Sequence, residues 1–353
     1  MIAPASAVPK GRSECGGAVV ATAKPERPCK FLKNFINCAK YAFLCPGQGA
    51  QAQGMIKDIC EAYPEAQKVV DEASKIAGKD VAKLLWDTPQ EELNRSDNSQ
   101  LAITTASIAI MAALKTKGIE PSAAMGFSLG EFPALYAAGI LSFEDVIKIV
   151  CQRGSIMQTV CEQIAEENAG NAPGMSAVLG LPPEKVEEIA AGIDGAYAAN
   201  LNSVKQTVVA GTADGLAKVE EAAKACGARR VVRLAVAGPF HSPLMQRAAD
   251  NFKVALEPFT FTDPKITLFS NVTGKKVTEG APAKASAVDH LTNPVRWTDE
   301  EKVLADLIKE DGSEWAVLEV GPGKVLSGLW GQTEFGATLP AVAVNTAEVL
   351  ASL

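Results

Sequence analysis

Residues 122–138 have the sequence SAAMGFSLGEFPALYAA, in which a short apolar run, a glycine-rich turn and a helical segment follow one another. We expect a strand over 122–127 and a helix over 129–138. Similar segments alternate along the chain: strands at 41–45, 266–270, 315–320 and 340–344, and helices at 55–77, 98–116 and 143–163. This alternation predicts an α/β fold with a mostly parallel sheet.

One segment follows a different order. Its elements are expected as strand, helix, strand, strand, helix and strand, at 175–180, 183–192, 196–202, 206–211, 213–226 and 229–236. The order βαββαβ is typical of ferredoxin-like folds. We therefore expect a small subdomain over 166–236, inserted into a larger body formed by 41–165 and 237–353.

Composition excludes several classes of protein. The chain has 353 residues, a formal net charge of −7 and 47% hydrophobic residues, which is enough to bury a core without disulfides. The sequence contains no run of about 18 apolar residues, so no membrane-spanning helix is expected. The acidic balance argues against nucleic-acid binding. The eight cysteines form no CxxC pair, so we expect no metal site and a reducing compartment.

The charge is unevenly distributed. Residues 1–40 carry seven Lys or Arg and two Glu, a net of +5, which leaves −12 for residues 41–353. The first segment is rich in Ala, Pro and Gly and lacks the apolar core of a secretory signal, so we expect a leader for import into an organelle, either plastid or mitochondrion. The alternative is a disordered extension of a cytoplasmic protein.

The turn in the opening stretch is a GxSxG motif between a strand and a helix. This context is the one that a nucleophile elbow requires, so Ser128 is a candidate nucleophile, and an ordinary turn is the alternative. A serine needs a base. Of the two histidines, His241 lies in a loop directly after a strand, which suits catalysis. His290 lies in or at the end of a helix, where a structural or solvent-facing role is expected.

Two further features suit a ligand site. The turn Pro46–Gln51 has glycines that permit close approach of its backbone to a ligand, although a simple turn explains it equally well. Arg153 lies in the middle of the apolar face of the helix at 143–163. A buried guanidinium either pairs with a buried carboxylate of the protein or binds an anionic substrate, and spacing leaves both open.

Taken together, the motifs resemble those of the malonyl-CoA:acyl carrier protein transacylase family, and of acyltransferase domains in fatty-acid and polyketide synthases. The resemblance extends over about 41–350 and rests on six segments in the family's order: PGQGAQ at 46–51, GFSLGE at 126–131, QRGSIMQ at 152–158, Phe-His at 240–241, NPVRW at 293–297 and EVGPGKVLSGL at 319–329. It implies an α/β-hydrolase-like body with an inserted ferredoxin-like subdomain.

The resemblance also implies roles in catalysis. Ser128 would be the acylated nucleophile and His241 its base. The backbone amides of Gln48 and Leu129 would form the oxyanion hole. The backbone carbonyl near His290 would orient the base, at a position where the family usually has Gln.

Other implications concern the substrates. Arg153 would bind the free carboxylate of a malonyl group, with Gln48, Phe240 and His290 also near the substrate. Phe240 precedes the base and is associated with malonyl over methylmalonyl selectivity, whereas Phe127 replaces the His of many members. The expected reaction is malonyl transfer from malonyl-CoA to acyl carrier protein by a monomer, without cofactor or metal.

Two other classes remain to be distinguished. A serine hydrolase would use the same nucleophile and base but would be expected to add a triad carboxylate between them in chain order. An inactive relative would bind the carrier protein without becoming acylated.

Overall fold

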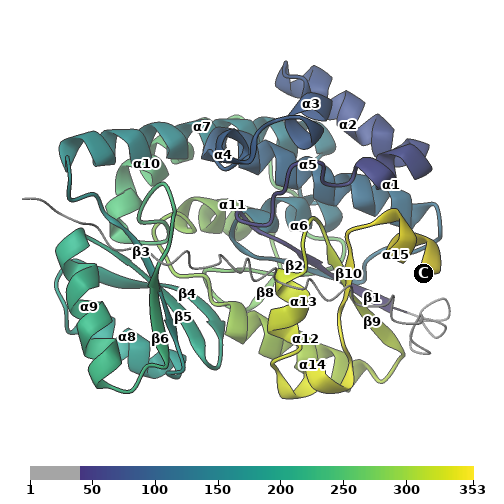
Figure 1. The fold of residues 1–353 in the computed structure, drawn as a ribbon. Helices are drawn as coiled ribbons and strands as arrows, with labels where there is room; N and C mark the ends of the chain where they lie inside the picture. The colour runs from purple at the N-terminus through teal and green to yellow at the C-terminus, as the bar shows by residue number, and fades with distance from the viewer. Residues whose placement is uncertain (1–39) are drawn as a thin grey trace, which may run out of the picture.

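The structure is a computed structural model that describes residues 40–353, which form two β-sheets and the helices around them (Figure 1). The larger sheet, called the main sheet, has the strand order β10-β9-β1-β2-β7-β8. Its strands are β1 (Lys40–Cys45), β2 (Ala123–Gly126), β7 (Thr267–Phe269), β8 (Lys276–Val277), β9 (Trp315–Val320) and β10 (Val342–Val344). Neighbouring strands are parallel except for β7 and β8, which confirms the expected mostly parallel α/β sheet.

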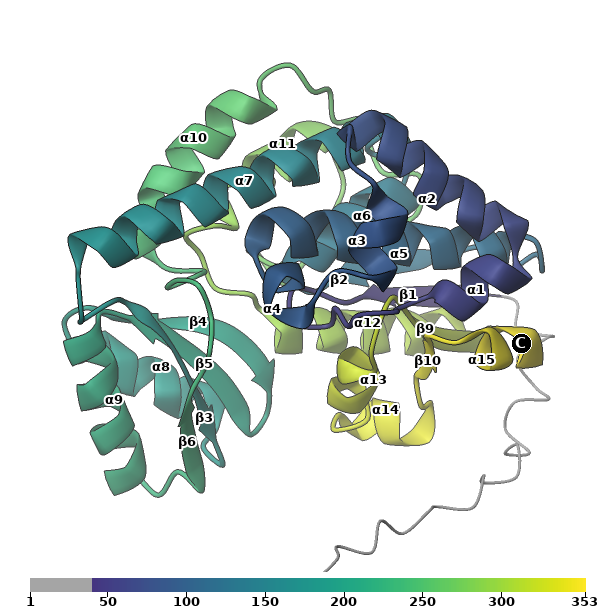
Figure 2. The same ribbon diagram turned by 45° about the horizontal axis from the view of Figure 1, so that its top comes forward.

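Helices cover both faces of the main sheet, which is why its central strands are mostly apolar. In β1, Phe43 packs in one core cluster and Leu44 in the other. The helices on the side of Phe43 are α1 (Lys57–Ala62), α2 (Pro64–Ala77), α3 (Val81–Trp86), α4 (Gln90–Leu93), α5 (Ser96–Lys115), α6 (Glu131–Ala137), α7 (Phe143–Glu167), α10 (Gln246–Leu256), α11 (Gly280–Asp289) and α15 (Ala347–Ser352). Those on the other side are α12 (Trp297–Asp311), α13 (Val325–Trp330) and α14 (Glu334–Thr338). Figure 2 shows the two layers from a second direction.

The smaller, four-stranded sheet lies beside this body with its two helices, as Figure 1 shows. Its strands are β3 (Gly174–Leu179), β4 (Ala196–Ser203), β5 (Gln206–Gly211) and β6 (Arg230–Arg233), in the order β4-β5-β3-β6 with every pair antiparallel. The helices are α8 (Pro183–Ala191) and α9 (Ala213–Ala225). They pack on one face of the sheet in a separate apolar cluster. The expected ferredoxin-like order is confirmed, whereas the exact bounds 166–236 remain a prediction.

Two local expectations differ from the structure, and a third lies outside the described residues. The helix expected over 55–77 is two helices, because the chain is extended at Tyr63 before Pro64. The last strand of the small sheet ends at Arg233, so residues 234–237 leave it and line a cavity. The expected leader over 1–40 lies outside the described residues except for Lys40, which begins β1.

The ends of β1 and β2 are in close contact, which places their two loops side by side. Phe127 donates its backbone N–H to the Cys45 carbonyl at 2.9 Å. A Cβ atom at Gly130 would lie 2.0 Å from that same carbonyl oxygen, and one at Gly47 would lie 2.3 Å from the Phe127 carbonyl oxygen. The glycines of both motifs are therefore required by contact between the two loops.

We predict that Gly130→Ala destabilises the protein by about 1–3 kcal/mol or more, because the added methyl group overlaps the β1 backbone. The backbone angles at Gly130 are helical, so the effect is steric and not conformational. Gly328→Ala is the matched control, since a Cβ there meets no atom within 4 Å. Urea unfolding of both variants measures the difference, and equal stabilities would contradict the prediction.

Candidate active site

Ser128 lies at a sharp turn between β2 and α6, as the first residue of the short 3₁₀ turn η2 (Ser128–Gly130). Its φ angle is +52°, a left-handed conformation that is unfavourable for a residue with a Cβ atom. A Cβ at Gly126 would lie 1.9 Å from the Gly130 carbonyl oxygen, so the turn can close only with glycine at 126. This turn places the Ser128 side chain at the carboxyl end of the main sheet.

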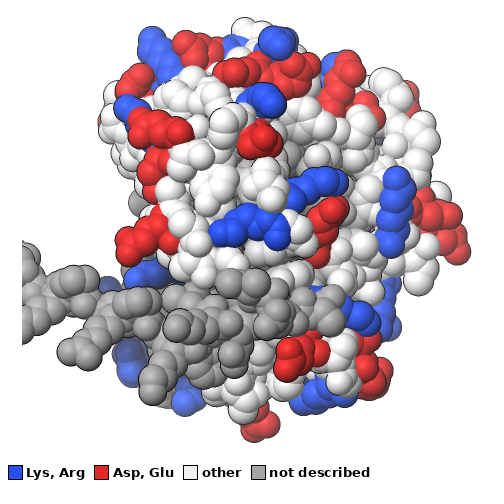
Figure 3. Space-filling view, turned by 90° about the vertical axis from the view of Figure 1, so that its right-hand side faces the viewer, with Lys and Arg blue, Asp and Glu red and all other residues white. Residues whose placement is uncertain are grey.

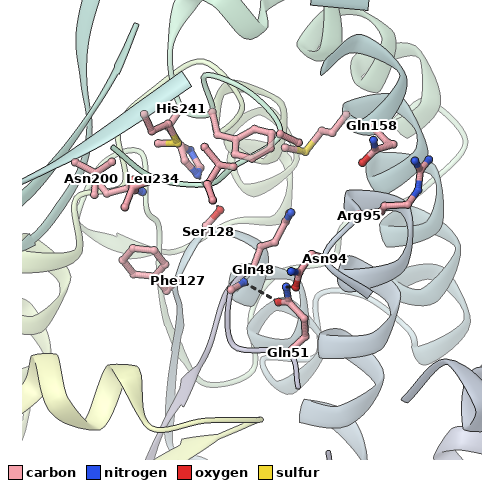
Figure 4. Close-up of a pocket in the computed structure, with 18 of the residues that line it drawn as sticks. Gln48, Gln51, Asn94, Arg95, Phe127, Ser128, Gln158, Asn200, Leu234 and His241 are labelled. Carbon is pink, nitrogen blue, oxygen red and sulfur yellow. Dashed lines mark hydrogen bonds between the residues drawn. The ribbon is translucent and has the colours of Figure 1, made fainter. Parts of the chain in front are cut away.

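His241 faces Ser128 from the loop that follows β6. Its Nε2 atom lies 2.8 Å from Ser128 Oγ, and Figure 4 shows the two side chains pointing toward one another. His241 also has a left-handed backbone, with φ at +59°. The next residue, Ser242, donates its hydroxyl to the Pro239 carbonyl at 2.6 Å and closes the loop. Both members of the pair therefore occupy strained positions, which is common at functional sites.

His290 supports His241 through its backbone. The His290 carbonyl, at the end of α11, accepts a hydrogen bond of 2.8 Å from His241 Nδ1. A proton on Nδ1 leaves the Nε2 lone pair directed at the serine hydroxyl. The His290 ring is fully buried, so it is not solvent-facing, and it does not line the cavity described below. It packs 5.0 Å from the His241 ring, with Nδ1 3.9 Å from Glu131 Oε2.

The environment keeps the His241 imidazole neutral. Burial is the main cause that lowers its pKa, to about 4, and the positive charge of Arg153 adds to it. The hydrogen bond to the His290 carbonyl acts in the opposite direction. A neutral imidazole with a free lone pair can accept the serine proton at neutral pH.

Arg153 lies on α7 and is 1% exposed. Its Nη1 donates to Gln100 Oε1 at 2.9 Å, and the guanidinium lies over the Phe132 ring. Within residues 40–353, no carboxylate lies within 4.0 Å of it, and its Nε and Nη2 atoms have no hydrogen-bond partner. Burial lowers its pKa to about 10, so it remains charged at neutral pH. No salt bridge to a carboxylate of the described residues therefore compensates the charge of this guanidinium.

A cavity of about 690 Å³ contains both features. Ser128, His241 and Arg153 line it together with Gln48 and Phe240. Its opposite wall comes from the uncovered face of the small sheet, with Met175, Asn200, Asn202 and Val208. Figure 4 shows this arrangement, with Asn200 and Leu234 on one side and Arg95 and Gln158 on the other. The cavity therefore lies between the small sheet and the loops and helices of the larger body.

The backbone amides of Leu129 and Gln48, which the resemblance assigns to the oxyanion hole, belong to two loops in contact with each other. In the elbow, the Ser128 N–H donates to Asn271 Oδ1 at 2.7 Å and the Gly130 N–H to the Phe127 carbonyl at 2.8 Å, which leaves Leu129 between them. In the adjacent loop, the Gly49 N–H donates to Gln51 Oε1 at 2.7 Å, which leaves Gln48. The loop of Gln48 contacts the elbow through Gly47 and Phe127, and Leu129 directly follows the nucleophile.

Aromatic rings border the reactive corner of the cavity. Phe240 packs against the apolar face of the small sheet. Phe127 makes an edge contact with the Trp297 ring at a centroid distance of 5.4 Å. Both line the cavity, so they limit the space beside the acyl group of any substrate attached to Ser128.

Sequence reasoning missed two residues that hold the site together. Gln100 fixes Arg153, and its signal was an amide side chain in a helix, α5, whose centre is built from apolar and small residues. Asn271 contacts the Ser128 backbone, and its signal was a polar residue directly after a strand of a parallel sheet. Within residues 40–353, no group of three His, Cys, Asp or Glu side chains is arranged to hold a metal ion. No helix in that range is long and apolar enough to cross a membrane.

We predict that the reactivity of Ser128 toward a fluorophosphonate probe stays constant from pH 8 to below pH 6 and falls only as His241 is protonated near pH 4. Burial and the Arg153 charge lower the pKa of His241 because both disfavour the imidazolium. The base therefore stays neutral as the pH falls. The unfolded chain binds this proton near pH 6.5, so stability also decreases below that pH, and circular dichroism must confirm folding at each point. Arg153→Ala should move the midpoint upward. A wild-type midpoint near 6.5 would contradict the prediction.

Comparison with known proteins identifies the family of the chain. Residues 42–328 match the acyl transferase domain family. The chain is 39% identical over 295 residues to the malonyl CoA-acyl carrier protein transacylase of Bacillus subtilis, covering 82% of this chain and 89% of that protein. It is 36% identical over 318 residues to the enzyme of the same name from Escherichia coli K12, covering 89% and 98%.

Solved structures agree with these sequence matches. The fold is similar to that of an acyl carrier protein S-malonyltransferase from Vibrio cholerae, with a TM-score of 0.80, 35% identity and coverage of 89% of this chain and 99% of that chain. It is equally similar, with a TM-score of 0.80 and 34% identity, to a malonyl-transacylase in complex with a type II polyketide synthase acyl carrier protein, covering 89% and 98%. The chain belongs to the acyl transferase family and is an acyltransferase.

Proposed function

We propose that this enzyme transfers a malonyl group from malonyl-CoA to the pantetheine thiol of acyl carrier protein, in fatty-acid biosynthesis. The observation that carries the proposal is the buried guanidinium of Arg153, whose Nε and Nη2 atoms have no hydrogen-bond partner among residues 40–353, in the same cavity as the Ser128–His241 pair. Malonyl differs from acetyl by a free carboxylate, and a planar guanidinium binds a carboxylate through two parallel hydrogen bonds. The names of the relatives support the same substrates.

In the first half-reaction, His241 accepts the proton of Ser128 as the serine oxygen attacks the thioester carbonyl. The amides of Gln48 and Leu129 donate hydrogen bonds to the developing oxyanion. The bond from carbon to sulfur then breaks, and the departing thiol of CoA takes the proton from His241. The product is malonyl-Ser128, whose carboxylate stays bound to Arg153.

In the second half-reaction the carrier thiol replaces CoA. It gives its proton to His241 and attacks the malonyl-serine carbonyl, and Ser128 leaves with that proton. The reaction exchanges one thioester for another, so it needs no cofactor. The carbonyl of His290 keeps the base in one tautomer throughout.

The carrier protein must dock where its pantetheine arm can reach this cavity. The face in Figure 3 carries Lys and Arg interspersed with Asp and Glu, and offers no extended field of one sign. Because residues 41–353 are acidic, we expect an acidic carrier to dock on a small basic surface.

We also propose that residues 1–40 direct the enzyme into an organelle. Support comes from their basic charge and from the family match, which begins at residue 42.

The proposed function is tested by the intact mass of the full chain after exposure to malonyl-CoA. We expect the mass to rise by one malonyl group, the adduct to be absent in Ser128→Ala, and holo carrier protein to remove it and become malonylated. Release mainly as free malonate would indicate a hydrolase. A wild-type chain that gains no mass would indicate a carrier-binding protein without activity.

A second prediction concerns the acyl group. Arg153→Ala should lower kcat/KM for malonyl-CoA about 100-fold, the value of a charged hydrogen-bonded contact, while acetyl transfer is retained or improved. Arg95→Ala is the matched control: Arg95 lines the same cavity but is 43% exposed and already paired with Asp97 and Glu162. An equal loss for malonyl and acetyl would contradict the role of Arg153.

A further inference from the structure

A buried polar cluster lies beneath the nucleophile and outside the cavity. It consists of Asn271, Glu131 and Glu300, each of which is at most 2% exposed as a residue. Asn271 follows β7, which is the neighbour of β2 in the main sheet, so its side chain reaches the turn that carries Ser128. None of the three lines the cavity, so substrate contact does not explain their burial.

The side chain of Asn271 joins the two sides of the nucleophile turn. Its Oδ1 accepts the Ser128 N–H at 2.7 Å, and its Nδ2 donates to the Gly126 carbonyl at 2.6 Å. The second Nδ2 hydrogen goes to Glu300 Oε1 at 2.8 Å. This set fixes the orientation of the amide, because rotation by 180° would place an N–H group against the Ser128 N–H.

The backbone of Asn271 is held as firmly as its side chain. Its N–H donates to Glu131 Oε2 at 3.0 Å, and its carbonyl accepts the Arg296 N–H at 2.9 Å. Glu131 belongs to α6, the helix that follows the nucleophile. The residue is therefore tied to the strand before Ser128, to the helix after it and to the N-terminal end of α12.

These bonds act on an unfavourable conformation. A left-handed backbone costs a non-glycine residue roughly 1–2 kcal/mol, and Ser128 adopts one at φ +52°. Its N–H lies at the start of η2, where a helix supplies no acceptor, and Asn271 Oδ1 accepts it. The bond also removes the Ser128 amide from the donors available to an oxyanion.

We propose that Asn271 is a positioning residue that locks the nucleophile turn, so that Ser128 Oγ is held at His241 and the Leu129 amide alone serves as the oxyanion donor of the elbow. The inference rests on the proposed function only in that Ser128 is the nucleophile. Asn271 does not touch the substrate, and its loss changes the rate of attack on the acyl group and not the binding of malonyl-CoA.

The test compares Asn271→Ala and Asn271→Asp with Ser176→Ala. Ser176 is equally buried and donates a 2.6 Å hydrogen bond to Glu220, but it lies in the small sheet away from the elbow. Its variant therefore reports the effect of losing a buried hydrogen bond on folding alone. Thermal unfolding of each variant fixes the temperature at which all are folded.

The first readout is the rate of Ser128 labelling by a fluorophosphonate, which needs no malonyl-CoA. We expect Asn271→Ala to label about 100-fold more slowly, since small displacements of reacting groups have effects of this size. Asn271→Asp keeps the acceptor for the Ser128 N–H and should lie between Asn271→Ala and wild type. With malonyl-CoA, kcat should fall while KM stays within about threefold. Ser176→Ala should label like wild type.

The outcomes separate this inference from the proposed function. A wild type that reacts with the probe but not with malonyl-CoA would contradict the malonyl reaction, and the probe would still measure the effect of Asn271. Labelling of a folded Asn271→Ala variant within threefold of wild type would overturn the inference. Hydrogen exchange of the Ser128 amide in wild type is independent of variant folding: strong protection is expected, and exchange as fast as in an open loop would overturn it.

Discussion

The hydrogen bond between Ser128 Oγ and His241 Nε2 is the interaction on which the rest of the site depends. It joins the carboxyl end of the main sheet to the loop that leaves the small sheet, and both residues have left-handed backbones. Neither conformation is favourable alone, so each is maintained by contacts around it. The glycines at 126 and 130 let the serine turn close, and the His290 carbonyl fixes the imidazole.

The second constraint is electrostatic. Arg153 is a buried cation without a carboxylate within 4.0 Å among residues 40–353, and such a charge is unfavourable in a low-dielectric site. It lowers the pKa of His241 and, together with burial and His241, that of His290. Glu131 interacts favourably with Arg153, but burial raises the pKa of Glu131 to about 7, so its compensating charge is incomplete near neutral pH. The site therefore favours a bound anion, which supports the proposed role of Arg153 in selecting malonyl over acetyl.

A site residue could be predicted from the sequence only where its role depends on neighbouring residues in the chain. Ser128 and Arg153 could be identified because a strand–turn–helix motif and a helical apolar face are short-range patterns. The assignment of His241 as the candidate base rested on the loop after a strand, and the structure brings it to Ser128. Asn271 and Gln100 could not be assigned a role, because their importance comes from contacts with residues 143 and 53 positions away. No local pattern specifies such contacts.

The segment that carries His290 and the NPVRW motif explains how Ser128 and His241 are held together although they come from different sheets. Val295 forms a bridge with Asn200 of β4, and two backbone hydrogen bonds of 2.9 Å join it to that strand. The same segment supplies the carbonyl that holds His241, and the backbone N–H of Arg296 that holds Asn271. One stretch of chain thus connects the small sheet to the body. The same stretch fixes the tautomer of His241 and holds Asn271, which supports the nucleophile turn. Because the loop that carries His241 leaves the small sheet after β6, a shift of that sheet would move the base away from Ser128, and this stretch resists that shift.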